Sequence, residues 1–249
     1  MAKLKGLLKI EGTLDELTFY KTQDGNLVRT KGGVSAERIA NDPAFARTRE
    51  NGSEFGSAAS AGKLLRNTVR PLMMKAADNR VTSRLTQVMT KIKDHDTGSQ
   101  RGDRVVGKGI THAAGLQLLK GFNFNDRAVL GSVLFSPYSV VQSAGEVALQ
   151  NFVPINDLAY PTGATHVTLR SGFAIVDFVN GTGVVEISSP TNLPIDGTVS
   201  NLSLKPNVLP VGNGTSLYLL MIEFFQEVNG IQYSLKNGAY NVLAIVDAA

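Results

Sequence analysis

The run LYLLMI at residues 217–222, together with VLAIV at 242–246, decides the fold of the C-terminal half. Apolar and polar side chains normally alternate along a strand that has one face in water. Neither run alternates. We therefore expect two central strands covered on both faces, or strands whose outer face meets a neighbouring subunit.

Shorter apolar or alternating runs surround these two strands at a spacing of about ten residues. Asn-Gly turns at 180, 213, 229 and 237 separate several of them. This spacing is typical of an antiparallel sandwich or barrel. We predict an α+β protein that ends in an antiparallel β-sandwich, Ig-like or jelly-roll-like, over residues 111–249. The other predicted strands are 129–135, 140–142, 166–169, 174–178, 184–187, 199–204 and 231–233.

The first part of the chain, residues 1–110, is predicted to hold a hairpin and basic helices. β-prone runs at 17–21 and 26–30 flank Asp24-Gly25, which is a strong signal for a tight turn. We expect this hairpin to be exposed.

Three helices are expected after the hairpin. Asp42-Pro43 predicts a first helix that begins near Ala44 and is interrupted at Asn51-Gly52. A second helix would cover residues 53–77, with a kink at Pro71.

The third helix is the clearest, because apolar residues recur in it at offsets of four, seven and eleven. These residues are Val81, Leu85, Val88 and Ile92. Basic side chains on an adjacent stripe make this helix amphipathic and basic. They are Arg80, Arg84 and Lys91. Residues 94–109 are polar and glycine-rich, which predicts a linker or long exposed loop and a domain boundary near residue 110.

Charge is distributed unequally between the two halves of the chain. Residues 1–127 hold 22 of the 25 Lys and Arg and 13 of the 21 Asp and Glu, so the remainder is acidic. A bipolar molecule of this kind can attract copies of itself head to tail, or offer a basic face to a polyanion. The asymmetry therefore concerns association.

Length and composition restrict the class of protein. The chain has 249 residues, 43% of them apolar, which is enough to bury a sizeable core. It contains no Cys, which excludes disulfides, thiolate nucleophiles and Cys-ligated zinc. We expect cytoplasmic synthesis without a signal peptide, with release in a particle left open, and no insertion into a membrane.

Two stretches resemble ligand-binding loops without matching them. Residues 102–109 fit the phosphate-binding loop pattern except at Gly109, where magnesium ligation needs Ser or Thr. Asp94-His95-Asp96 resembles the start of a calcium loop, but Gly98 arrives one position early and Val105 replaces the final Glu. We favour the solvated loop for both.

No motif of enzymatic chemistry is present in the sequence. The three histidines lack paired ligand spacing, and no Gly-x-Ser-x-Gly elbow occurs. We therefore predict a protein that is not an enzyme and has no cofactor and no metal site.

Two binding functions stay open beside a structural one. The basic helices could contact duplex phosphates without sequence preference, whereas the lack of aromatic residues between Phe55 and Phe122 disfavours single-strand binding. A carbohydrate-binding sandwich would have to stack sugars on tyrosines. The candidates are Tyr160, Tyr218, Tyr233 and Tyr240.

Two segments carry a resemblance to known sequences. Residues 20–66 read YKTQDGNLVRTKGGVSAERIANDPAFARTRENGSEFGSAASAGKLLR, and residues 226–249 read QEVNGIQYSLKNGAYNVLAIVDAA. Both are similar to an uncharacterised family of Bacteroidetes proteins, over about a third of this chain. The resemblance implies a recurrent unit and transfers no activity.

These observations favour a structural subunit that assembles with copies of itself into a filament, tube, shell or virion-like particle. The contacts would be head to tail, between the N-terminal hairpin and basic helices of one copy and the acidic sandwich of the next. The predicted contact residues are Phe19, Tyr20, Leu27 and Val28 in the hairpin and Arg66, Arg70, Arg80 and Arg84 in the helices.

Overall fold

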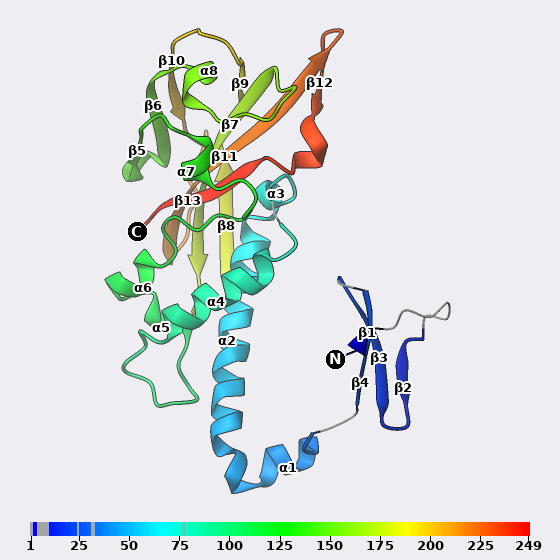
Figure 1. Ribbon diagram of the computed structural model, residues 1–249. Helices are drawn as coiled ribbons and strands as arrows, with labels where there is room; N and C mark the ends of the chain where they lie inside the picture. Colours follow the sequence, from blue (N-terminus) through cyan, green and yellow to red (C-terminus); the bar gives the residue numbers. More distant parts are fainter. Residues whose placement is uncertain (1, 4–9, 24, 31–32, 77) are drawn as a thin grey trace. The chain divides into compact units, whose positions relative to one another are not determined.

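The computed structural model describes residues 2–3, 10–23, 25–30, 33–76 and 78–249 (Figure 1). The protein is α+β, with helices in its first half and a large antiparallel sheet toward its C-terminus. It forms two compact units, Met1–Arg49 and Glu50–Ala249, called unit 1 and unit 2 below.

Unit 1 contains a four-stranded antiparallel sheet in the order β1-β4-β3-β2. The predicted hairpin is confirmed as β3 and β4, in which Phe19 lies opposite Val28 and Tyr20 opposite Leu27. Asp24 of the predicted turn lies outside the described residues. The strands are β1 Ala2–Lys3, β2 Gly12–Leu14, β3 Leu17–Thr22 and β4 Gly25–Thr30.

Helices follow the sheet. The side chain of Asp42 accepts a hydrogen bond from the Ala44 backbone N–H, which is the predicted cap at a helix start. The first turns are α1 Ala36–Asn41 and the 3₁₀ turn η1 Pro43–Phe45, and α2 Ala46–Thr68 comes next.

The predicted interruption at Asn51-Gly52 is wrong, because α2 runs through it without a break. Both residues are exposed, and a helical Gly costs only about 1 kcal/mol relative to Ala. Burial of Ala58, Ala61 and Leu65 further along the same helix offsets that cost. The chain instead breaks after Thr68, and Pro71 lies in the first turn of a separate short helix, α3 Arg70–Met73.

The third predicted helix is confirmed as α4 Val81–Lys93. Val81, Leu85 and Ile92 are buried as expected, while Met89 is buried in preference to Val88. The helix therefore presents a 3.6-residue apolar stripe to the core.

Residues 94–109 are only in part the linker or exposed loop that the sequence predicts: residues 94–105 contain turns and bends and many of them are exposed, but other residues of the segment are packed. Asp96 is buried, and residues 106–109 form the short helix α5 Val106–Gly109. A Cβ on Gly109 would overlap the carbonyl oxygen of Ile92 and lie 2.9 Å from its carbonyl carbon. Such close approach of two backbones joins this segment to α4, and the compact units divide after Arg49 and not near residue 110.

Unit 2 is built on one long antiparallel pair, β7 with β11, in register from Thr215 opposite Val176 to Phe225 opposite His166. β13 and β12 pair with different halves of β11, and β8 and β9 with different halves of β7 (Figure 1). The strands of this sheet are β7 His166–Asp177, β8 Thr182–Ile187, β9 Thr191–Pro194, β11 Thr215–Val228, β12 Ile231–Ser234 and β13 Val242–Ala248.

A second, smaller sheet has the order β10-β6-β5. Its strands are β5 Tyr138–Val141, β6 Glu146–Phe152 and β10 Ser200–Leu204. The strand predicted at 129–135 is wrong, because part of it forms the helical turn α7. The remaining short helices are α6 Ala113–Gln117, α7 Leu130–Val133, η2 Gln142–Ala144, α8 Pro154–Asp157 and η3 Leu235–Gly238.

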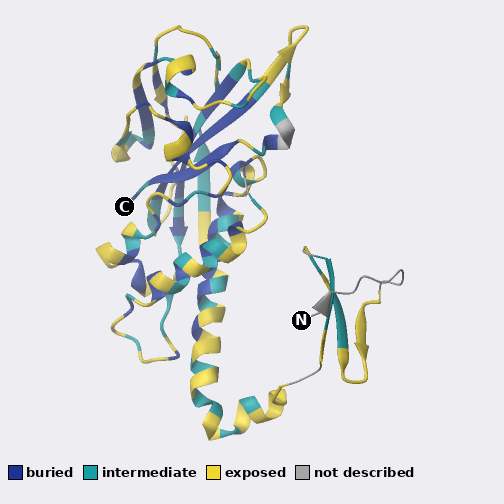
Figure 2. Ribbon diagram, in the orientation of Figure 1, coloured by how far each residue is buried: buried dark blue, intermediate teal, exposed yellow. Residues whose placement is uncertain are grey.

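The strands β7, β11 and β13 of the large sheet are buried on both faces over most of their length, whereas β12 and the adjoining end of β11 are mostly exposed (Figure 2). Leu217, Leu219 and Met221 pack into a core with the apolar residues of α2 and α4. Tyr218 and Leu220, which point the other way, pack into a second core with residues of β6 and β10.

Both apolar runs are therefore covered on both faces within a single chain, as expected, and β11 is a central strand between β7 and β13. The expectation that β13 is also central is wrong, because among the described strands it pairs with β11 alone. Its other edge forms backbone hydrogen bonds with Gly121, Phe122 and Phe124.

Replacement of Gly109 by Ala tests the close approach of α5 to α4. The new methyl group would overlap the Ile92 backbone, so we expect the free energy of unfolding to fall by about 3 kcal/mol, the upper end of overpacking costs. Urea unfolding followed by circular dichroism measures it.

Gly52→Ala is the matched control, since a Cβ at Gly52 meets no atom within 4 Å. It should raise the free energy of unfolding by about 0.5–1 kcal/mol. Equal effects of the two substitutions would contradict the packing assigned to Gly109.

Candidate functional site

A cleft of about 690 Å³ lies between α2, α5 and the turn that joins β7 to β8. We call it the α2–α5 cleft. Its volume falls within the ~300–1,000 Å³ that is usual for ligand-binding clefts. The cleft is lined by Ser57, Ser60, Ala61, Lys63, Leu64, Asn67, Val105, Val106, Gly107, Lys108, Phe178, Val179, Asn180 and Gly181.

Two local features position the walls of this cleft. A Cβ on Gly107 would lie 2.8 Å from the Val179 side chain, so Gly permits α5 to approach the β7–β8 turn closely. Asp177 fixes that turn by accepting hydrogen bonds from the backbone N–H groups of Val179 and Asn180, both at 2.9 Å. The Asn180 backbone hydrogen bond is the largest contribution that lowers the pKa of Asp177.

The lining of the cleft contains two cations and no carboxylate, and the buried Asp96 carboxylate outside the lining interacts electrostatically with Lys108. Lys63 and Lys108 are its only ionisable lining residues, and both are exposed. Lys108 donates a hydrogen bond to the hydroxyl of Ser99 at 2.9 Å. Leu64, Phe178 and Val179 supply apolar surface beside these cations. The arrangement suits an occupant that combines negative charge with apolar side chains.

Buried charges hold the loop that precedes α5. Glu54 of α2 forms an ion pair with Lys93 of α4, and its second carboxylate oxygen accepts a hydrogen bond from the Gly102 backbone N–H at 2.8 Å. The hydrogen bond from Lys93 is the main reason why the pKa of Glu54 lies below its ordinary value. Glu54 thereby ties two helices and the loop together.

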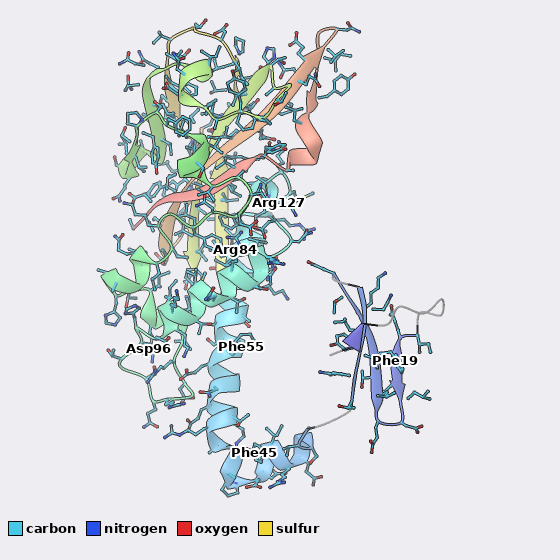
Figure 3. The ribbon with its side chains drawn as sticks, viewed as in Figure 1. Phe19, Phe45, Phe55, Arg84, Asp96 and Arg127 are labelled. Carbon is cyan, nitrogen blue, oxygen red and sulfur yellow. The ribbon has the colours of Figure 1, made fainter. Side chains whose placement is uncertain are left out.

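Asp96 organises the same loop (Figure 3). Its carboxylate accepts hydrogen bonds from the backbone N–H groups of Ser99 and Val105, each at 3.1 Å. Burial opposes ionisation, but these hydrogen bonds outweigh it and hold the pKa of Asp96 below its ordinary value. The carboxylate that resembled a calcium ligand thus caps the loop. No group of three potential metal ligands occurs among the described residues.

The stretch that resembles a phosphate-binding loop also has a structural explanation. Its Gly107 and Gly109 lie where a Cβ would meet Val179 and Ile92, so both serve close packing. A turn and bend segment, not a strand, precedes α5 within residues 94–105. The structural context of a P-loop is absent from this segment.

The four predicted interface arginines differ in their surroundings. Arg84 donates to the backbone oxygens of Asn123 and Phe124 at 2.7 and 3.2 Å, forms an ion pair with Asp78 and lies over the Phe122 ring (Figure 3). It therefore joins α4 to the following chain segment. Arg66 donates to Thr82 at 2.9 Å across two helices, while Arg70 and Arg80 are exposed.

The predicted hairpin contacts are divided between the two faces of the unit 1 sheet. Directly opposed residues of an antiparallel pair point to the same face, so Phe19 and Val28 share one face and Tyr20 and Leu27 share the other. Arg29 lies 5.5 Å from the centre of the Tyr20 ring, which makes the second face more polar. The sequence alone did not separate these faces.

Part of the charge asymmetry is neutralised inside the chain. Lys75 and Arg170 lie 3.3 and 3.5 Å from the carboxylate oxygens of Glu223, and Lys120 lies 2.9 Å from Asp247. The hydrogen bond to Asp247 is the main cause that raises the pKa of Lys120. Glu223 and Asp247 are therefore poor candidates for contacts with a second copy.

The four tyrosines that could stack on sugars differ in their exposure to solvent. Tyr218 is buried, stacks on Phe173 with ring centroids 4.8 Å apart, and donates to the Gln142 carbonyl oxygen. It cannot stack on a sugar from solvent. Tyr160, Tyr233 and Tyr240 are exposed.

Comparisons with known proteins found no match to a family model, to a curated protein or to a solved structure. Among the described helices, none is long and apolar enough to cross a membrane.

Lys93→Met tests the buried ion pair. The variant leaves the buried Glu54 carboxylate with the more distant Arg104, at 3.9 Å, in place of the Lys93 ammonium, so the free energy of unfolding should fall by about 3 kcal/mol near neutral pH. The loss should shrink as the pH falls and Glu54 becomes protonated, because the poorly compensated buried charge then disappears. The wild type should respond to pH in the opposite way. Because the pKa of Glu54 is lowered in the folded state, ionised Glu54 stabilises the fold above its ordinary pKa, and this stabilisation is lost on acidification.

Lys91→Met, on the exposed side of the same helix, is the control and should change stability by less than about 0.5 kcal/mol. Urea unfolding of both variants at about pH 7 and about pH 4 gives the comparison. A pH-independent loss in Lys93→Met would show that the pair is not the cause.

Proposed function

We propose that the protein is a non-enzymatic structural subunit that assembles with copies of itself, through head-to-tail contacts, into a filament, tube, shell or virion-like particle. One observation carries this proposal. The sheet of unit 1 has an apolar face, yet among the described residues 10–49 none is buried. A sheet with an apolar face is stable in water only when a second layer covers that face.

The apolar face is defined by the strand register. Leu14 lies opposite Leu17, and Phe19 lies opposite Val28, so all four side chains share one face across β2, β3 and β4. Leu14 is 63% exposed and Leu17 41% exposed. This face, called the Phe19 face, is the surface that a second copy would cover.

Unit 2 supports the proposal as a folded body that could form the repeating part of an assembly. Its large and small sheets share an apolar core. That the two sheets form a β-sandwich, with an Ig-like or jelly-roll-like connection of the strands, is part of the proposal. We also propose synthesis in the cytoplasm, with release only as part of an assembled particle.

Nucleic-acid binding is the second candidate function. Four cations from the helices of unit 2 are exposed, and the described part of the chain gives none of them an ion pair. Binding of duplex phosphates by these side chains would weaken steeply with salt, which distinguishes it from assembly through an apolar face. The four cations are Lys63, Arg70, Arg80 and Lys91.

Phe19→Asp tests the proposed function. A carboxylate on the Phe19 face cannot be buried in a subunit contact, whereas burial of Phe contributes roughly 1.5–3 kcal/mol. The protein concentration at which half of the chains are assembled should therefore rise at least about tenfold. Sedimentation velocity over a concentration series, with negative-stain microscopy, measures this.

Thr18→Asp is the matched control, because Thr18 lies opposite Arg29 on the other face of the same strand. This variant should assemble like the wild type. Assembly of Phe19→Asp at wild-type concentrations would contradict the proposal, as would a wild-type protein that is monomeric at every concentration.

A further inference from the structure

The turn between β2 and β3 carries an acidic and apolar surface, although the N-terminal half of the chain is basic as a whole. Leu14 and Leu17 close this turn, and Asp15 within it has a left-handed backbone conformation with φ 49°. Glu11, Asp15 and Glu16 are exposed around them. We call these five residues the acidic tip.

The α2–α5 cleft has the complementary composition. Lys63 and Lys108 are exposed in a lining that contains no carboxylate, and the described part of the chain gives Lys63 no ion pair. Val179 is 74% exposed and Phe178 lies beside it in the lining. The cleft, with apolar surface beside cations, is therefore complementary to the acidic tip, with apolar side chains beside carboxylates.

We propose that the acidic tip of one copy docks in the α2–α5 cleft of a second copy. Leu14 and Leu17 would contact the apolar lining, and the tip carboxylates would pair with Lys63 and Lys108. This inference rests on the proposed function and names its contact surfaces. The contact is heterologous, since a tip meets a cleft, and repetition gives a ring or an open polymer according to whether the rotation closes.

The proposed contact reverses the polarity expected from the sequence. The acidic carboxylates Glu223 and Asp247 of unit 2 are already paired with Lys75, Arg170 and Lys120 of the same chain. The acidic partner is instead a local group in unit 1, and the basic partner is the cleft in unit 2. The net charges of the two halves do not show where the acidic tip and the basic cleft lie.

Disulfide trapping tests the contact, because the natural chain has no Cys. Leu14→Cys is introduced in one copy and Val179→Cys in a second copy that carries a different tag. Mild oxidation of the mixture should give a disulfide-linked heterodimer, at least about tenfold more than with the control Val199→Cys, given the orienting effect of complementary surfaces. Val199 is 60% exposed in the segment before β10.

Charge reversal supplies a second readout. Lys63→Glu with Lys108→Glu in the cleft copy should reduce trapping several-fold, and Asp15→Lys with Glu16→Lys in the tip copy should restore it. Circular dichroism confirms that each variant is folded.

The outcomes separate this contact from the proposed function. Assembly of the wild type with equal trapping at Val179→Cys and Val199→Cys would overturn the tip–cleft contact and leave self-assembly standing. Trapping only within one chain, in a Leu14→Cys/Val179→Cys double variant, would overturn docking between copies. A wild type that never assembles would overturn the proposed function itself.

Discussion

The antiparallel pairing of β7 with β11 is the interaction on which the rest of unit 2 depends. These strands are paired along their whole common length, and β11 carries consecutive apolar side chains from Leu217 to Ile222. Because successive side chains point to opposite faces, such a strand must have a core on each side. The helices α2 and α4 cover one face, and the smaller sheet covers the other. The order of layers in unit 2 follows from that requirement.

The helical layer is held by close backbone contacts and buried charges. Gly109 and Gly115 permit successive backbone segments to touch, and Glu54 links α2, α4 and the loop before α5. These contacts place α5 beside the β7–β8 turn and thereby form the α2–α5 cleft. The cleft is a consequence of packing that the fold requires, and its two lysines give it a positive charge.

The features that the sequence could predict are those with a local signal. The Asp-Gly pair predicts the hairpin, and the helical spacing of apolar residues predicts α4. The continuous apolar runs at 217–222 and 242–246 predict strands that are covered on both faces. The packing of residues 94–109 has no local signal in the sequence. Glycine and polar residues occur both in exposed loops and where two backbone segments lie in close contact, so their presence does not distinguish the two. The sequence also gives no sign of the α2–α5 cleft, because its lining comes from three segments that only the fold brings together. Arg84 looked like part of a basic surface because the backbone oxygens that it binds lie about forty residues away.

Unit 1 leaves an apolar face without a covering layer in the described chain, and the central claim is that a second copy supplies this layer. Hydrogen exchange of the wild type over a concentration series tests that claim most directly, because amides in β3 and β4 are protected only while the sheet is stabilised. Protection of β3 and β4 should rise with protein concentration, while protection of β7 and β11 stays constant. Protection of β3 and β4 that is independent of concentration would contradict the account.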